Sequence, residues 1–155
     1  MCDYSLMAVP NRLAQQGEEL VAHRFPTGSL GLAAPADVKR AAQPRPMARR
    51  TIWQAIQQFF DPAAAPAVCA VCIPPGARLE LSGIPVRLQK LWDVASTEEV
   101  EFTQISANVN TYRDALRLTS GRLVRLQDLW EGIQVRVLDL SAAEEPVWEL
   151  ESEML

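Results

Sequence analysis

Short runs of alternating apolar and polar residues, bounded by glycine or proline, are the feature that most constrains how this chain can fold. The clearest example is the segment 116–126, in which two alternating runs flank a turn that contains Gly121. Successive side chains of a β-strand point to opposite faces, so an alternating run fits a strand with one buried face, and glycine fits the tight turn between two such strands. We therefore expect a β-hairpin over 116–126.

Similar runs recur along most of the chain. The segment 68–73 is almost wholly apolar, which is typical of a buried strand. Residues 86–92 fit either a continuation of the sheet or a short turn. Together the patterns predict strands at 2–7, 19–25, 68–73, 77–81, 99–105, 112–118, 122–126 and 134–140. Many short strands at this spacing predict a mainly β fold, a small antiparallel barrel or sandwich.

One segment, 51–60, has the pattern of a helix. Thr51 and Gln54 match a capping box, in which each side chain accepts a hydrogen bond from a backbone N–H at the helix N-terminus. Apolar residues then recur at helical spacing until Pro62 ends the run. We expect a short helix here, about residues 51–60, packed on the sheet. It belongs to a stretch rich in proline, alanine and basic residues that covers 33–66.

Composition places the chain among single-domain globular proteins. Of its 155 residues, 48% are hydrophobic and 22% are charged, and a chain of this size and composition can bury a core without a disulfide or a metal. We expect one β-rich domain over 1–140 and an acidic C-terminal tail over 141–155. Within the domain, the first part of the 33–66 stretch, residues 33–46, is expected to be a loop or linker.

Charge and hydropathy restrict the partners and the location. A net charge of −4 argues against general nucleic-acid binding, which needs a clustered basic surface. The N-terminus lacks the pattern of a signal peptide, and no apolar run approaches the ~20 residues of a membrane span, so we expect a cytoplasmic protein without a transmembrane segment. Basic residues beside the helix at 51–60 leave two kinds of contact open: an anionic membrane surface, or a protein partner or second copy bound through that helix.

Three cysteines and one histidine are the candidate metal ligands. Cys69 and Cys72 have the spacing of a metal knuckle or a redox pair, but residues three apart in an extended strand point to opposite faces. Together with Cys2 and His23 they would complete a four-ligand site for zinc or another transition metal. The odd count and a reducing compartment predict free thiols and no disulfide. Buried, inert strand cysteines are the main interpretation, and we expect no cofactor.

Cys2 is the candidate catalytic residue. Removal of Met1 would leave a chain that begins with cysteine, whose α-amino group can act as the base for its own thiol. The opening Met1-Cys2 is similar to that of N-terminal-nucleophile amidohydrolases such as class II glutamine amidotransferases, and this resemblance implies a nucleophilic role for Cys2. Asp3 departs from the glycine common in that family, and no Asn-Gly oxyanion segment follows.

A second resemblance extends over most of the chain. The residues that carry it are Met1-Cys2-Asp3-Tyr4-Ser5-Leu6, Ala70-Val71-Cys72 leading to Pro75-Gly76, Asp114-Ala115-Leu116, and Gly132 before Val137-Leu138-Asp139-Leu140. In these the chain resembles small uncharacterised bacterial proteins that open with the same six residues. The resemblance implies a bacterial, cytoplasmic protein of no known activity, and it makes Cys2 and Cys72 the natural pair to test.

These patterns favour a non-catalytic cytoplasmic binding or protein-interaction domain over an enzyme. Two alternatives stay open. One is a metal-binding or thiol-dependent enzyme centred on Cys2, and the other is a peripheral adaptor that uses the basic amphipathic segment 45–60. Asp114, an acid within an expected strand, is assigned a structural role.

Overall fold

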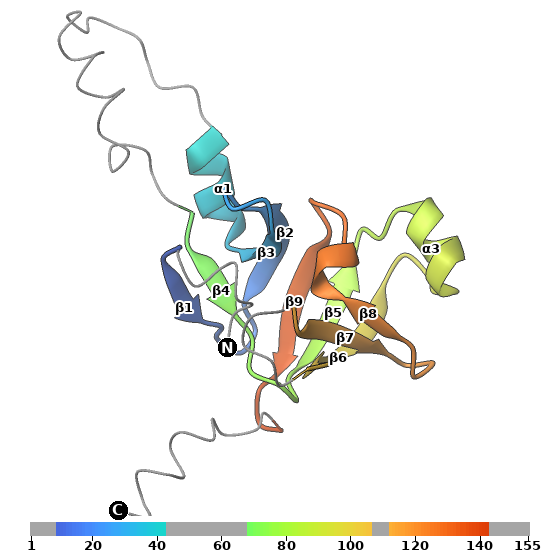
Figure 1. Ribbon diagram of the computed structural model, residues 1–155. Coiled ribbons are helices and arrows are strands. Elements are labelled where there is room, and N and C mark those ends of the chain that lie inside the picture. Colours follow the sequence, from blue (N-terminus) through green and yellow to red (C-terminus); the bar gives the residue numbers. More distant parts are fainter. Residues whose placement is uncertain (1–8, 43–67, 107–111, 143–155) are drawn as a thin grey trace, which may run out of the picture.

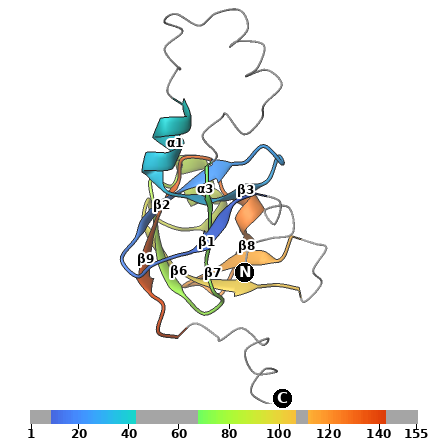
Figure 2. The same cartoon turned by 90° about the vertical axis from the view of Figure 1, so that its left-hand side faces the viewer.

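The computed structural model of this chain describes residues 9–42, 68–106 and 112–142, which form a single curled sheet with two α-helices and a short 3-10 helix (Figure 1). In chain order the elements are β1 (Asn11–Leu13), β2 (Glu19–Arg24), β3 (Leu30–Ala33), α1 (Pro35–Ala42), β4 (Ala70–Cys72), β5 (Arg78–Ser82), α3 (Val86–Trp92), β6 (Glu98–Gln104), β7 (Asp114–Leu118), β8 (Leu123–Arg125), η3 (Leu126–Asp128) and β9 (Gln134–Asp139). The sheet curls into a half-barrel, seen from two sides in Figures 1 and 2. The prediction of a mainly β barrel or sandwich is confirmed.

The last strand, β9, joins the two halves of the sheet. The spatial order is β1-β4-β3-β2-β9-β5-β6-β7-β8, so β9 lies between β2 from the N-terminal half and β5 from the C-terminal half. Neighbouring strands are antiparallel except β1 and β4, which are parallel. Because the chain must return to its beginning to place β9, most of the fold depends on contacts between residues distant in sequence.

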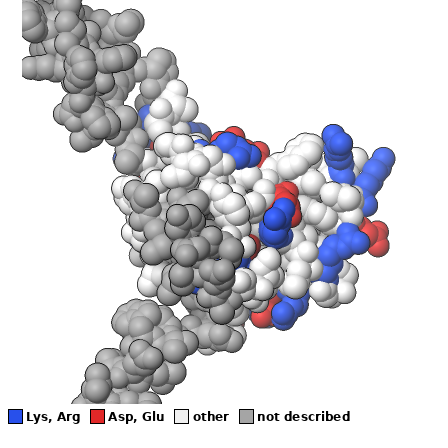
Figure 3. All heavy atoms as spheres, in the orientation of Figure 1, with Lys and Arg blue, Asp and Glu red and all other residues white. Residues whose placement is uncertain are grey.

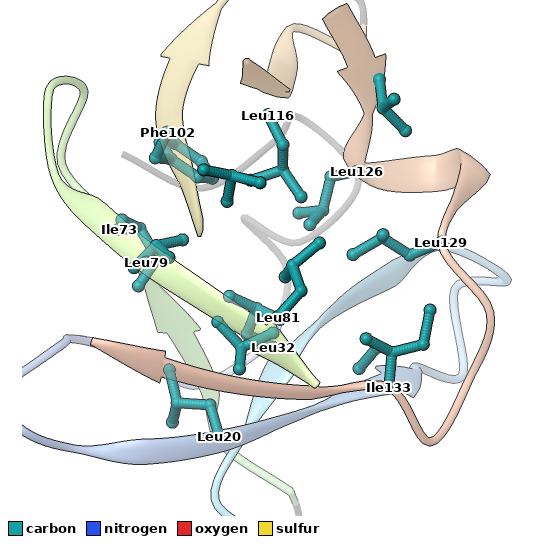
Figure 4. Close-up of a cluster of buried hydrophobic side chains, with 14 of the residues drawn as sticks. Leu20, Leu32, Ile73, Leu79, Leu81, Phe102, Leu116, Leu126, Leu129 and Ile133 are labelled. Atoms are coloured by element: carbon teal, nitrogen blue, oxygen red, sulfur yellow. The ribbon is translucent and has the colours of Figure 1, made fainter. Parts of the chain in front are cut away.

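The concave face of the sheet holds the main hydrophobic core. Alternate residues of each strand face inward, as in β9, where Val135 and Val137 lie opposite Leu81 and Leu79 of β5 and all four are buried. Side chains from most strands and from η3 meet in this core (Figure 4). Full burial of each aliphatic or aromatic side chain stabilises the fold by roughly 1.5–3 kcal/mol.

The opposite face of the N-terminal strands carries a second, smaller apolar cluster. It consists of Phe25, Ala33, Ala70 and Cys72, and Val38 of α1 packs against it. Ala70 and Cys72 are alternate residues of β4, so they share one face, while Val71 between them belongs to the main core. The short strand β4 is therefore buried on both faces, as its apolar sequence predicts.

The helix α1 corrects the prediction of a loop or linker at 33–46. Residues 35–42 are helical and lie beside β2 in both views (Figures 1 and 2). Pro35 suits the first turn because its missing N–H has no partner there in any case. Asp37 in the first turn and Lys39 with Arg40 in the last turn complement the helix dipole. The proline and the basic residues were interpreted as linker composition, whereas their order is that of a helix start and end.

The helix α3 corrects the prediction of a strand or turn at 86–92. Pro85 before it is extended, and Asp93 after it has left-handed backbone angles, which end the helix. Leu88 and Trp92, four residues apart, are the buried residues of the helix and pack into the main core. Within the three described ranges, no helix is both long and apolar enough to cross a membrane.

Most predicted strands are confirmed, and two real ones were missed. The strands predicted at 19–25, 68–73, 77–81, 99–105, 112–118, 122–126 and 134–140 correspond to β2, β4, β5, β6, β7, β8 and β9. The hairpin over 116–126 is confirmed, with Leu116 opposite Val124. The short strands β1 and β3 were not among the predicted strands. The strand predicted at 2–7 and the helix predicted at 51–60 lie outside the described residues.

The 3-10 helix η3 connects the β8 edge of the curved sheet to β3 in the N-terminal half. The side chain of Gln127 accepts a hydrogen bond from the backbone N–H of Leu30 at 2.9 Å and donates one to the carbonyl oxygen of the same residue at 2.8 Å. Leu30 begins β3, whereas Gln127 follows β8 at the far edge of the sheet. One side chain thus pairs both polar groups of a buried residue and holds the curl closed at this point.

Candidate functional site

Two of the predicted cysteine ligands differ in chemical state. Cys72 is buried in β4 and disulfide-bonded. Cys69, just before β4, is a free, half-buried thiol whose sulfur lies 3.7 Å from the carbonyl oxygen of Ala70. The prediction of no disulfide is therefore wrong, because three cysteines can form one pair and still leave one thiol free. The remaining cysteine of the chain, Cys2, lies outside the described residues.

The predicted histidine ligand lies in a packing position on β2. Nδ1 of His23 is 3.4 Å from a carboxylate oxygen of Glu131, and that same oxygen accepts a hydrogen bond from the backbone N–H of Arg24. The imidazole ring packs edge-on against Phe25, with the ring centroids 5.0 Å apart. Among the described residues no group of three or more His, Cys, Asp and Glu side chains is placed to hold a metal. The metal site that includes Cys2 stays a prediction.

A group of buried polar side chains lies where β7 begins. Arg113 and Asp114 are almost fully buried, and Gln104 of β6 donates a hydrogen bond to a carboxylate oxygen of Asp114 at 3.4 Å. Nearby in the chain, the hydroxyl of Tyr112 is 3.0 Å from that of the buried Ser29, which precedes β3. Charged groups removed from water need such partners, and their loss is costly. These contacts join β7 to β6 and to the N-terminal half, as the structural assignment of Asp114 expects.

The convex face of β5, β6 and β7 is covered by charges of both signs. Arg78 on β5 pairs with Glu99 on β6, and Arg117 on β7 lies 3.8 Å from Glu101 on β6. An open recess of about 630 Å³ borders this face, and Arg78, Glu101 and Thr103 are among its lining residues. Opposite charges that face each other across strands stabilise a sheet. Because they satisfy each other, they leave this recess without an excess of either charge.

A different surface combines exposed apolar and basic side chains. It consists of Val86, Arg87, Lys90 and Leu91 on the outer side of α3, together with Arg122 from the turn between β7 and β8, and we call it the α3 patch. Val86 and Leu91 are 64% and 65% exposed. The Arg122 guanidinium donates a hydrogen bond to the carbonyl oxygen of Leu91, which fixes the turn against the C-terminal end of the helix.

Helical geometry explains why the four patch residues of α3 share one side of the helix. Positions 86 and 90, and 87 and 91, are four apart, so each pair is aligned along the helix axis. Leu88 and Trp92 anchor the opposite side in the main core. The patch therefore points away from the barrel, and its orientation is fixed by two buried side chains.

The α3 patch carries a net positive charge that the described part of the protein does not neutralise. Within the described residues, no ion pair involves Arg87 or Lys90, whereas Arg78, Arg117 and Arg136 each pair with a glutamate. The exposed acid that follows the helix, Asp93, offsets one of the three positive charges. Basic side chains project at this side of the molecule in Figure 3, where Figure 1 places α3.

Sequence reasoning missed this surface because residues 86–92 were not recognised as a helix. The available signal was the spacing of Leu88 and Trp92 after Pro85, with Lys90 between them on the opposite side. No family model, curated protein or solved structure matches this chain.

Proposed function

We propose that this protein is a non-catalytic binding or protein-interaction domain, as its sequence pattern favours, and that the α3 patch is its contact surface. The observation that carries the proposal is the exposure of Val86 and Leu91, each about two-thirds exposed, on one side of a helix that also presents Arg87 and Lys90. Single exposed apolar residues are ordinary, but two on a rigid helix face with unneutralised cations form a surface with a defined chemical preference.

The chemistry of the patch specifies its partner. The aliphatic side chains favour apolar groups, and the three cations favour carboxylates, so the matching partner is an acidic peptide segment that also carries apolar side chains. Full burial of Val86 and Leu91 would contribute roughly 1.5–3 kcal/mol each, and each exposed ion pair about 0.2–1 kcal/mol. Because association costs at least about 4 kcal/mol, at most about 5 kcal/mol of this sum remains, and a Kd of roughly 0.2 mM or weaker is expected.

A titration of the full-length protein with synthetic peptides tests this proposal. The probe is a peptide of alternating glutamate and leucine, and its control carries lysine in place of each glutamate. Binding is measured by fluorescence anisotropy of the labelled peptide and by methyl NMR shifts of Val86 and Leu91. We expect the acidic peptide alone to bind, to shift those methyl signals, and to weaken at least tenfold between 50 and 500 mM salt because the contact is partly ionic.

A pair of charge-matched variants locates the contact. The double variant Arg87→Glu/Lys90→Glu reverses the patch, and Lys39→Glu/Arg40→Glu makes the same change of charge on α1, another exposed helix. We expect at least a tenfold loss of affinity for the first and less than a threefold change for the second. Equal losses in both variants would show that only net charge matters. Absence of binding to the unmodified protein, at a concentration at which it is monomeric, would refute the proposal.

A further inference from the structure

We infer that the partner of the α3 patch is the acidic C-terminal segment of a second copy of this chain, so that the protein associates with itself. This inference rests on the proposed function of the patch and adds the identity of its partner. Three observations support it: the charge of the segment, its apolar content, and the position from which it leaves the sheet.

Residues 143–155 have the composition that the α3 patch requires. They contain five glutamates, no lysine and no arginine, together with the apolar residues Val147, Trp148, Leu150, Met154 and Leu155. Acidic and apolar side chains alternate along Trp148, Glu149, Leu150 and Glu151. The patch offers two exposed aliphatic side chains and three cations, so both kinds of group find a counterpart.

The sheet register places the start of this segment far from α3 of its own chain. Gln134, the first residue of β9, pairs with Ser82, the last residue of β5, and α3 follows shortly after Ser82. Asp139 at the other end of β9 pairs with Arg78. The chain therefore leaves β9 at the end of the sheet opposite to α3, as Figure 1 also shows. The six residues of β9 separate these two ends by about 17–20 Å.

Chain length then favours a second copy over the same molecule. Ala142 is the last residue described before the segment. From there to Trp148 a fully extended chain covers at most about 20 Å. This is about the length of β9, so the extended chain would reach back along β9 but would not also cross from the sheet to α3. Trp148, Glu149 and Leu150 therefore suit the patch of a neighbouring molecule, to which the whole segment is available.

Exchange between two copies would make two identical contacts. In a two-fold dimer the segment of each copy binds the patch of the other. Two weak contacts then form in the same complex, and together they hold the dimer more tightly than one contact would. Sedimentation equilibrium of the full chain measures the dimer Kd directly. We expect concentration-dependent dimers whose Kd rises at least tenfold between 50 and 500 mM salt, since both contacts are partly ionic.

Two reciprocal charge reversals test the identity of the partner. The patch variant Arg87→Glu/Lys90→Glu and the tail variant Glu149→Lys/Glu151→Lys should each weaken dimerisation at least tenfold. When the two variants are mixed, the acidic patch of one faces the basic tail of the other, and the remaining pair has its native charges. We therefore expect the mixture to form heterodimers with an affinity within threefold of the original. The α1 variant Lys39→Glu/Arg40→Glu should dimerise as the unmodified chain does.

The possible results separate this inference from the proposed function. A chain that stays monomeric while the glutamate-leucine peptide still binds the patch would overturn the inference and leave the proposed function standing. A monomer in which Glu149→Lys/Glu151→Lys shifts the methyl signals of Val86 and Leu91 would show that the tail binds its own chain, which also overturns the second-copy assignment. Failure of both the peptide titration and dimerisation would refute the two together.

Discussion

The side chain of Gln127 provides the sharpest test of how the half-barrel is held together. It forms two hydrogen bonds to the backbone of Leu30, one through each atom of its amide group. Leu30 is 2% exposed, so water cannot readily replace either bond. We predict that Gln127→Ala destabilises the fold strongly, because it leaves a buried N–H and a buried carbonyl oxygen without their partners.

The expected loss follows from the cost of the two unpaired groups. Each buried polar group that loses its partner costs about 1–3 kcal/mol. Since Gln127 itself is only partly buried, some water can enter in its place, and we expect a total near the lower half of the sum, about 2–4 kcal/mol. For a chain of this size that corresponds to a fall in Tm of roughly 4–16 °C.

Urea denaturation followed by tryptophan fluorescence measures the free energy of unfolding. Gln134→Ala is the matched control, since Gln134 is exposed and its side chain accepts a long hydrogen bond, 3.4 Å, from the hydroxyl of Ser82. Its cost should stay within about 0.5 kcal/mol. Gln127→Glu keeps an acceptor for the Leu30 N–H but sets an oxygen against the Leu30 carbonyl, so its loss should be at least as large as that of Gln127→Ala. A Gln127→Ala loss no larger than that of Gln134→Ala would refute the closure of the sheet by η3.

Three further measurements test other parts of the fold. Arg12 donates hydrogen bonds to the carboxylate of Glu18 and thereby holds the pKa of that carboxyl below its usual value. The pair therefore stabilises the fold fully when the pH is above the usual pKa of a glutamate, and this stabilisation is lost as the pH falls through the lowered pKa of the folded protein. Glu18→Gln should therefore cost about 1 kcal/mol at pH 7, and the difference in unfolding free energy from the unmodified protein should close as the pH falls below the lowered pKa of Glu18. Asp93→Gly should raise the free energy of unfolding by about 0.5 kcal/mol, because glycine adopts the left-handed angles of this helix end without strain; a loss would show that the Asp93 side chain matters more than its backbone angles. Alkylation in denaturant without reductant should label one thiol, Cys69, and three after reduction; labelling of three without reductant would contradict the disulfide of Cys72 and restore it as a thiolate ligand.

The thiol count also bears on where the protein resides. Disulfides persist in oxidising compartments and are rare in the reducing cytosol. The disulfide of Cys72 and the expected cytoplasmic location therefore predict opposite redox forms of the same residue. Protein isolated without reductant from its native source would show which of the two is correct.

The strands were predictable from the sequence because their signal is local. In β5 the inward-facing Leu79 and Leu81 alternate with exposed or half-buried polar residues, and the same holds around Val135 and Val137 of β9. The pairing of these strands was not predictable. The placement of β9 between β2 and β5 depends on packing between residues more than 50 positions apart, which no short pattern records.

The missed elements show where local patterns fail. β3 is only four residues long and fully buried, so Leu30-Gly31-Leu32-Ala33 has no alternation to detect. In α1 no residue is fully buried, and the helix lacks the apolar stripe that the prediction required. In both cases the contacts of the element, rather than its own sequence, decide its conformation.

The candidate interaction surface was hidden from the sequence for a related reason. Val86, Leu88, Leu91 and Trp92 are all apolar, and a pattern assigns all four to the interior. Only the docking of α3 through Leu88 and Trp92 shows that the other two face water. The exposed pair therefore cannot be distinguished from core residues until the helix is placed.

This distinction yields a direct test of why Val86 and Leu91 are apolar. Because they are about two-thirds exposed, the double variant Val86→Gln/Leu91→Gln should change the free energy of unfolding by less than about 1 kcal/mol, whereas Leu88→Ala should cost about 2–5 kcal/mol. If the exposed pair serves binding, the double variant should weaken association with the acidic partner at least tenfold while the fold stays intact. Unchanged association with unchanged stability would mean that the cations alone bind, and the apolar half of the α3 patch would have no role in recognition.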